Sequence, residues 1–225
     1  FSAYVQGALS AQSHVRHEYF YEKKADQDSE KIINGGYNIK TGLSYSLKEY
    51  HVLFANAGKY SRQPFHTAVF SGNSNVPDDN IVNEDIESFE IGYKWSAPRI
   101  TAHVNLYRTA WNDRVFLNPL EVNENGMVRL TSGEWYEAEG RELYELLFQN
   151  QLHTGAEADV RWRINDHLRW KGMLSVGRWE VIGDREVEVY DGVTAFERVL
   201  KYMAEGENIK VGGAPQTSGG MGVEW

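Results

Sequence analysis

Residues 83–114 read NEDIESFEIGYKW, then SAPR, then ITAHVNLYRTAWNDR, and this stretch determines the fold class. On both sides of the link SAPR, apolar and polar residues alternate with a period of two, as in a β-strand with one apolar and one polar face. The link is tight and contains Pro98, which cannot donate a hydrogen bond inside a ladder. The stretch therefore predicts an antiparallel hairpin. Two environments fit it: a soluble β-sandwich buries the apolar face, whereas a membrane β-barrel turns that face to lipid and the polar face to a watery lumen.

The same alternation, followed along the whole chain, predicts about eight strands. They are residues 1–12, 37–47, 50–59, the two arms of the hairpin, 152–164, 168–181 and 217–225. The connections at Lys48, Pro98 and Asp166 are only a few residues long, and the connections between them are much longer. Compact soluble domains favour short loops throughout, whereas outer-membrane barrels alternate short periplasmic turns with long extracellular loops. We therefore predict an all-β, antiparallel, up-and-down transmembrane β-barrel with long outer loops.

The composition narrows the classes of function. The 225 residues carry Lys+Arg 23 against Asp+Glu 32, a net charge of -9, which argues against a nucleic-acid partner because nucleic acid requires a basic face. The absence of cysteine excludes disulfides and thiolate metal sites. The 13 Tyr and 7 Trp favour surfaces that are half apolar and half wet. Mean hydropathy is -0.54, and no stretch resembles a membrane helix. A membrane β-barrel has equally low mean hydropathy, because only alternate residues of its strands face lipid.

The alternation also assigns side chains to the two faces of the barrel. The outward-facing residues are predicted to be Phe89, Ile91, Tyr93, Ile100, Val104, Leu106, Val160 and Trp162. The lumen-facing residues are predicted to be Glu90, Lys94, His103, Asn105, Glu157, Asp159 and Arg161, with Arg163 beyond them. An Arg or Lys on the lipid face at mid-membrane costs roughly 2–4 kcal/mol, and residues 152–164 keep all their charges on one face. The charges on this face form a transport path, a wall that contacts the plug, or a wet lumen face in which they pair with one another; they are Glu90, Lys94, Glu157, Asp159, Arg161 and Arg163.

Two segments of the long connections carry a helical pattern. Within residues 139–148, the leucines at helical spacing are Leu143, Leu146 and Leu147. The second segment has a capping box at Thr194 and Glu197 and a stop signal at Gly206. Its apolar residues at helical spacing are Phe196, Val199, Leu200 and Met203. The pattern predicts a helical turn or two in the first segment and a short helix over residues 194–205 in the second.

Five short motifs follow one another along residues 50–225. They are Ser61-Arg62-Gln63-Pro64, Glu90-Ile91-Gly92-Tyr93-Lys94-Trp95, Asn105-Leu106-Tyr107, Gly155-Ala156-Glu157 and Gly213-Ala214-Pro215-Gln216. With the strands that carry them, they resemble the C-terminal half of the barrel of TonB-dependent outer-membrane receptors. The resemblance implies a barrel of about 22 strands, of which residues 1–225 form an internal part without the plug domain. Because both ends of the sequence lie within strand patterns, we expect a fragment of a longer chain.

The resemblance implies an active transporter in the outer membrane of a Gram-negative bacterium, energised through TonB. It would import a scarce nutrient: a siderophore, haem, cobalamin, a glycan or a peptide. The implied partners are outer-membrane lipid, TonB, the plug domain of the intact protein and the nutrient, and a surface lipoprotein on the loops is left open. Two alternatives also stay open: a small self-contained eight-stranded outer-membrane barrel, and a soluble β-sandwich that binds carbohydrate.

The connections over residues 60–83 and 112–150 hold the candidate ligand-binding residues. Outer loops of such receptors take the ligand from the medium, and Tyr, Trp and Arg provide large contact areas and directed hydrogen bonds. The candidates are Tyr60, Arg62, Phe65, His66, Trp135, Tyr136, Arg141 and Tyr144. The alternative is that these residues pack the loops against each other. The candidate membrane-interface aromatics are Tyr93, Trp95, Trp162 and Trp225, and the alternative for them is ordinary core packing.

The sequence predicts neither a catalytic site nor a metal site. The histidines that invite a metal interpretation lie far apart in the sequence, without ligand spacing: His51, His66, His103, His153 and His167. No nucleophile-elbow, zincin or phosphate-loop motif occurs. The acidic group Glu134, Glu137 and Glu139 has no second group of matching role nearby. We therefore expect no enzymatic activity and no cofactor.

Overall fold

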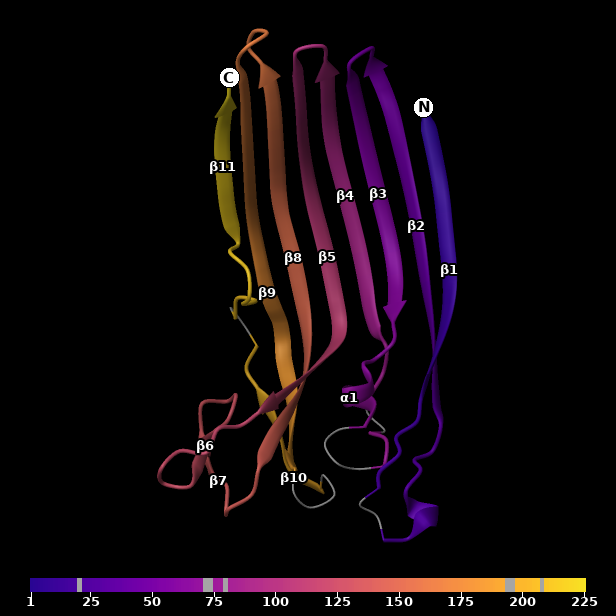
Figure 1. The fold of residues 1–225 in the computed structure, drawn as a ribbon, viewed down its shortest axis with the longest axis vertical. Coiled ribbons are helices and arrows are strands. Elements are labelled where there is room, and N and C mark those ends of the chain that lie inside the picture. Colours follow the sequence, from indigo (N-terminus) through magenta and orange to yellow (C-terminus); the bar gives the residue numbers. More distant parts are fainter. Residues whose placement is uncertain (20–21, 71–74, 79–80, 193–196, 207–208) are drawn as a thin grey trace.

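Eight long strands lie side by side in one antiparallel sheet in the computed structural model, which describes residues 1–19, 22–70, 75–78, 81–192, 197–206 and 209–225 (Figure 1). The long strands are β1 (Ser2–His14), β2 (Ile32–Lys48), β3 (His51–Arg62), β4 (Glu84–Ala97), β5 (Ile100–Pro119), β8 (Leu143–Arg163), β9 (Arg169–Asp191) and β11 (Thr217–Glu224). The connections hold a 3-10 helix (Lys24–Asp26), α1 (His66–Val69), β6 (Met127–Arg129), β7 (Trp135–Glu137) and β10 (Glu197–Ala204).

The long strands pair in the order of the sequence. From β1 to β9 each long strand lies antiparallel to the next, and β9 then pairs with two strands at different heights. Strand β11 lies against residues 169–176 of β9, and β10 lies against residues 185–191. The predicted all-β, up-and-down antiparallel topology is confirmed. Among the described residues β1 and β11 do not pair, so the sheet is open and does not close into an eight-stranded barrel.

Short turns gather at one end of the sheet and long connections at the other (Figure 1). The turns lie at residues 49–50, 98–99 and 164–168, whereas the connections at the opposite end span 15–31, 63–83, 120–142 and 192–216. The predicted alternation of short and long connections is therefore confirmed. No helix among the described residues is long and apolar enough to cross a membrane.

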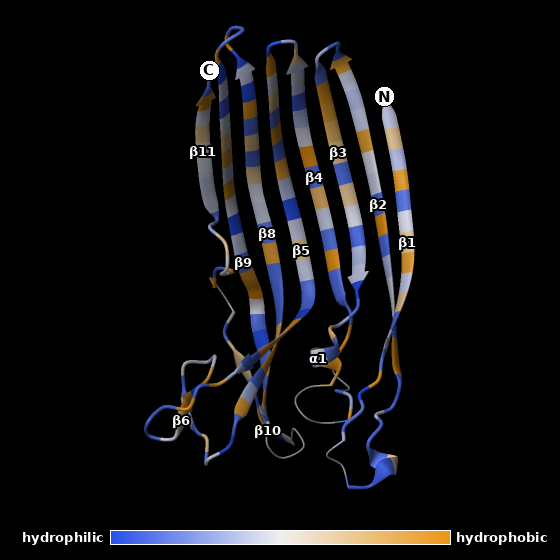
Figure 2. Cartoon of the chain, in the orientation of Figure 1, coloured by the Kyte–Doolittle hydropathy of each residue, from blue (hydrophilic) through white to orange (hydrophobic). Residues whose placement is uncertain are grey.

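The two faces of the sheet differ in chemistry. The register places Ile91 opposite Leu106 and Tyr93 opposite Val104, and these side chains share one face. This apolar face is open, since Leu106 is 53% exposed and Leu9 is 89% exposed. Figure 2 shows the alternation of hydrophobic and hydrophilic residues along each strand. A soluble sandwich would cover such a face with a second sheet, and the single main sheet of the described residues is not that architecture.

The buried core lies among the outer connections. One cluster consists of Val128, Leu130, Ala138, Leu143 and Val189. Two smaller clusters are centred on Leu146 with Tyr190, and on Leu147 with Val187 and Ala204. We call this region the outer sheet: β10, the β6–β7 hairpin, and residues 114–119 of β5, 143–149 of β8 and 182–191 of β9. The remainder of the long strands is called the wall.

Both helix predictions are wrong. Residues 143–149 belong to β8, where Leu146 packs into one cluster and Leu143 and Leu147 pack into two others. A strand that is buried on both faces loses its polar alternation, and its apolar run then imitates a helical pattern. The second helix prediction falls on β10, since residues 197–204 form a strand, and residues 194–196 lie outside the described part. A register shift between Arg198 and Leu200 breaks the period of two in that strand.

Candidate functional site

The first group of predicted ligand residues gathers at the outer end of β3. Tyr60 lies within β3 itself, and Arg62 ends that strand. The Arg62 guanidinium lies 4.5 Å from the centroid of the Phe65 ring, and its Nη1 is 3.1 Å from Glu84 Oε2. His66 begins α1, and its Nδ1 is 3.3 Å from Nδ1 of His14. Arg62, Phe65 and His66 thus form one group at the rim, with the Phe65 ring 60% exposed.

The second group belongs to a separate part of the outer sheet. Trp135 lies in β7 and is 57% exposed, whereas Tyr136 packs against the cluster around Val128. Arg141 donates hydrogen bonds to the Ala138 carbonyl at 3.1 Å and to Glu139 at 2.9 Å. Tyr144 packs against Leu146 and Tyr190. Of these four residues, Trp135 presents its ring to the medium, and the other three also hold the loop together.

The polar residues predicted to line the lumen share the polar face of the sheet. Asn56 Nδ2 donates to Glu90 Oε2 at 3.0 Å, and His103 Nδ1 lies 3.0 Å from Asp159 Oδ2. The register places Lys94 opposite His103, Asn105 opposite Glu157, and Arg161 opposite Lys171. On this face Asn56 and Glu90, and His103 and Asp159, therefore partner each other across strands, whereas Arg161 faces a like charge.

The candidate interface aromatics lie on the apolar face near the short turns. His51 Nδ1 is 2.5 Å from the Tyr93 hydroxyl, and the His51 ring stacks on Trp95 with centroids 6.1 Å apart. Trp162 is 47% exposed, on the same face, opposite Ile100. Trp225 follows the end of β11 and is 95% exposed.

A second constellation on the polar face was missed by the sequence analysis. We call it the arginine–aromatic cluster; its members are Tyr107, Trp111, Arg114, Phe116, His153 and Trp179. The Arg114 guanidinium lies 4.8 Å from the centroids of both the Trp111 and the Phe116 rings. His153 stacks on Trp179 at 5.3 Å, and Trp179 Nε1 donates to the Tyr107 hydroxyl at 2.9 Å. Three neighbouring strands, β5, β8 and β9, thus contribute to one patch of rings.

Local backbone features build this cluster. The register of β5 against β8 shifts between Trp111 and Arg114, where Asp113 has a positive φ of 57° and its N–H donates to Asn150 Oδ1. Such a bulge re-aims the side chain that follows it. Gly155, opposite Tyr107, leaves room for the ring, because a Cβ there would lie 2.5 Å from the Tyr107 hydroxyl. The sequence signal was the break in alternation at residues 112–113.

Arg114 is only partly satisfied by the protein. Its Nη1 donates to Gln151 Oε1 at 2.6 Å, and Gln151 is buried. Its Nε is buried and has no hydrogen-bond partner within the described residues. A buried donor without a partner is costly, so an acceptor supplied from outside the chain would stabilise it. The two rings that lie 4.8 Å from the guanidinium suit a flat or ring-bearing molecule.

Two buried carboxylates hold the outer sheet. Glu145 accepts hydrogen bonds from the Thr131 N–H and hydroxyl and from the Tyr202 hydroxyl, at 2.8, 2.7 and 2.5 Å. Glu188 is fully buried and accepts from the Tyr190 hydroxyl at 2.6 Å and from Arg198 Nη1 at 2.8 Å. Burial, together with the hydrogen bond to Glu145, raises the pKa of Tyr202. These groups connect β10 to the loop before β8 and thereby hold in place the β6–β7 hairpin, on which Trp135 lies.

No group of three or more His, Asp or Glu side chains in the described part of the chain is arranged to hold a metal ion. In a comparison with protein families, the model of the family described as TonB dependent receptor-like, beta-barrel, matches residues 6–225. A comparison with curated proteins gives no match.

Proposed function

Because the chain belongs to the TonB dependent receptor-like β-barrel family, we propose that it forms part of a receptor that imports a scarce nutrient across the outer membrane, energised through TonB. Membership in this family points to transport in the outer membrane of a Gram-negative bacterium. Residues 1–225 would supply one stretch of the barrel with its outer loops, and the plug domain would lie elsewhere in the intact protein. The nutrient is a siderophore, haem, cobalamin, a glycan or a peptide.

The observation that carries this proposal is the arginine–aromatic cluster on the polar face. Its Arg114 and Phe116 belong to the outer sheet and its other members to the adjoining part of the wall, so a ligand taken up by the loops would meet the cluster where the two regions join. The guanidinium of Arg114 lies there 4.8 Å from two ring centroids, and its buried Nε–H has no hydrogen-bond partner among the described residues. We propose that the loops over residues 60–83 and 112–150 capture the nutrient and that the cluster receives it. The periplasmic boundary of the outer membrane would be marked by four aromatic residues, Tyr93, Trp95, Trp162 and Trp225.

The first test changes the cluster in the intact receptor on cells. Arg114→Lys keeps the charge but loses the flat guanidinium that stacks on Trp111. We expect nutrient binding to weaken about tenfold for the member of the panel that the receptor transports. The panel contains a siderophore, haem, cobalamin, oligosaccharides and peptides. The matched control is Arg108→Lys, the same change in the same strand on the apolar face.

The second test separates capture from transport. Replacing residues 63–83 or 120–142 with a short Gly/Ser link should abolish binding, while replacing residues 22–30 should leave it unchanged. Cells that lack TonB should bind the nutrient normally and fail to accumulate it. Unchanged binding after both loop replacements, with normal receptor abundance, would show that the ligand is held elsewhere.

A further inference from the structure

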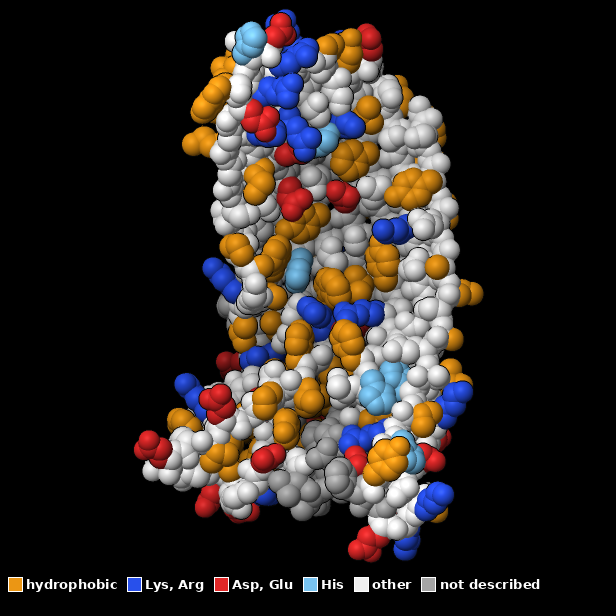
Figure 3. Space-filling view, in the orientation of Figure 1, with side chains coloured by type: hydrophobic (Ala, Val, Ile, Leu, Met, Phe, Trp, Pro, Cys, Tyr) orange, Lys and Arg blue, Asp and Glu red, His pale blue; other side chains and the backbone are white. Residues whose placement is uncertain are grey.

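Positive charge gathers on the polar face at the end of the sheet that carries the short turns. Figure 3 shows Lys and Arg side chains crowded there over the ends of β8 and β9. We call these residues the basic patch: Arg99, Arg161, Arg163, Arg169 and Lys171. The patch is positively charged although the chain as a whole has a net charge of -9.

The register brings like charges directly opposite one another. Arg161 faces Lys171, and Arg163 faces Arg169, across the β8–β9 pair. Directly opposed Cα atoms lie about 5 Å apart, and residues two positions apart on a strand lie about 7 Å apart, so these four cations occupy a very small area. The Arg163 N–H donates to the Arg99 carbonyl at 2.7 Å, which places the fifth cation beside them. Like charges at opposed positions destabilise a sheet.

The chain neutralises little of this charge. Lys171 pairs with Glu224, the one acidic residue that lines the same recess. Within the described part of the chain, Arg99, Arg161, Arg163 and Arg169 form no ion pair. Further along the same face, by contrast, His103 has Asp159 as a partner. The repulsion is thus concentrated in one place, where the lining of the recess sets a single carboxylate, Glu224, against five cations.

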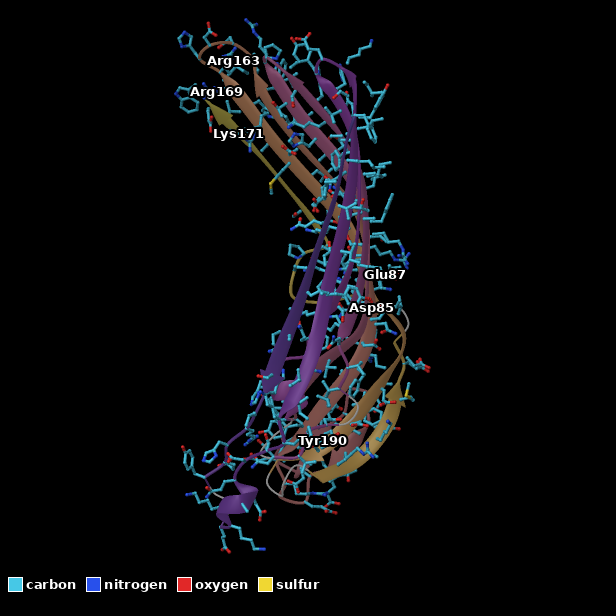
Figure 4. All side chains as sticks on the ribbon, turned by 90° about the vertical axis from the view of Figure 1, so that its right-hand side faces the viewer. Asp85, Glu87, Arg163, Arg169, Lys171 and Tyr190 are labelled. Carbon is cyan, nitrogen blue, oxygen red and sulfur yellow. The ribbon has the colours of Figure 1, made fainter. Side chains whose placement is uncertain are left out.

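The patch lines an open recess. Its volume is about 410 Å³, and its walls include Thr101, Glu224 and the five cations of the patch. Figure 4 shows Arg163, Arg169 and Lys171 close together at the end of the sheet, away from Asp85 and Glu87. The recess is large enough for a small molecule that reaches several cations at once.

We propose that the basic patch is a binding site for a small multivalent oxyanion of the phosphate type. Guanidinium groups donate paired N–H bonds to phosphate oxygens, and several of them converge here on one recess. The bound anion would supply the negative charge that Glu224 alone does not provide. The phosphate group belongs either to a free anion in the aqueous lumen or to a lipid headgroup. The proposal rests on register and charge alone, so it does not depend on which nutrient the receptor imports.

The test is calorimetric titration of the full-length receptor, in non-ionic detergent at low ionic strength, with inorganic pyrophosphate. The double variant Arg163→Gln, Arg169→Gln should bind pyrophosphate about tenfold more weakly or worse. The control Lys23→Gln, Lys24→Gln removes the same charge from the outer loop after β1 and should leave the affinity unchanged. Glu224→Gln should tighten binding several-fold, because it removes the carboxylate that competes for Lys171.

Two further measurements complete the test. Thermal unfolding without anion shows whether the double variant folds, and it should unfold at the same or a higher temperature because repulsion is relieved. The pyrophosphate affinity is then measured in vesicles with and without an anionic phospholipid. A lower affinity with that lipid would identify a lipid headgroup as the source of the phosphate group, and an unchanged affinity would identify a free anion. Equal affinities for the unaltered receptor and the double variant would overturn the proposal. Binding of an acidic peptide but not of pyrophosphate would overturn it too.

Discussion

The wall and the outer sheet are parts of the same strands, yet their apolar side chains have opposite environments. In the wall, Leu9 is 89% exposed and Leu106 is 53% exposed, whereas in the outer sheet Leu146 and Val189 are fully buried. A wall with exposed apolar residues suits a lipid solvent, in which the closed hydrogen bonding of strands is the main requirement. The outer sheet carries its own hydrophobic core, as a soluble domain does. A single strand such as β8 therefore has two environments along its length: its wall part suits lipid, and its outer-sheet part, residues 143–149, is buried in a protein core.

Polar groups show the same contrast. On the wall, charged pairs such as His103 and Asp159 remain partly exposed on the polar face. In the outer sheet, Glu145 and Glu188 are buried, and each is held by several donors. A buried carboxylate without donors would be strongly unfavourable. The outer sheet thus depends on packing and on complete hydrogen bonding of its buried side chains, whereas the polar side chains of the wall reach water and do not require complete hydrogen bonding within the protein.

The largest expected effect separates the two regions by the same change. Leu146→Ala in the full-length receptor should lower the free energy of unfolding of the outer sheet by roughly 2–5 kcal/mol, because it leaves a cavity in a closed core. Leu106→Ala should cost far less, since lipid fills the space that the side chain leaves. Hydrogen exchange of outer-sheet amides and urea unfolding in lipid vesicles measure the two effects. Equal losses at the two positions would remove the distinction between the regions.

A second prediction tests the faces of the wall. Leu106→Arg should destabilise the barrel by roughly 2–4 kcal/mol, because it places a charge on the lipid face. Asn105→Arg, one residue earlier on the polar face, should cost much less because the side chain reaches water. Urea unfolding in vesicles gives both values. A similar cost for the two variants would mean that the face assignment of β5 is reversed.

The wall could be predicted from the sequence because lipid and water impose a strict period of two on it. Residues 83–114 alone gave the hairpin β4–β5, and the turn at Pro98 lies where the alternation placed it. The outer sheet could not be predicted in the same way. In residues 143–149 both faces are buried, and in β10 a register shift interrupts the alternation. Each feature removes the periodic signal on which the prediction relied.

The candidate site was predictable in composition but not in geometry. The segment that contains Arg62, Phe65 and His66 is short, so their proximity follows from the sequence. The arginine–aromatic cluster depends instead on long-range register: Tyr107 faces Gly155, which faces Gly177, two residues before Trp179. No local pattern specifies how β5, β8 and β9 slide relative to one another. The bulge at Asp113 then turns Arg114 into the cluster.

The smallest expected effect concerns the charge of Glu188 in the outer sheet. Burial raises the pKa of this carboxyl, but hydrogen bonds from Tyr190 and Lys201 and the charges of Arg198 and Lys201 lower it by more, so the net shift of its pKa is downward. A carboxylate with a lowered pKa in the folded state stabilises that state at every pH above its unfolded pKa. This contribution is lost as the pH falls through the ordinary carboxyl range and then through the lowered value. The outer sheet should therefore open more readily in acid.

Limited proteolysis of the full-length receptor, followed from about pH 6 to about pH 3, measures this opening. Cleavage in the outer sheet should increase as the pH falls, while the wall stays intact. Glu188→Gln should raise cleavage at the higher pH and flatten the pH dependence, because the neutral amide cannot titrate. The matched control is Glu186→Gln, which removes a half-exposed carboxylate that also binds Lys201 at 2.7 Å. Screening by water leaves that pair with little effect on stability. If Glu186→Gln flattened the pH profile as strongly as Glu188→Gln, the acid response would come from surface charge, and the buried carboxylate would not distinguish the outer sheet from the wall.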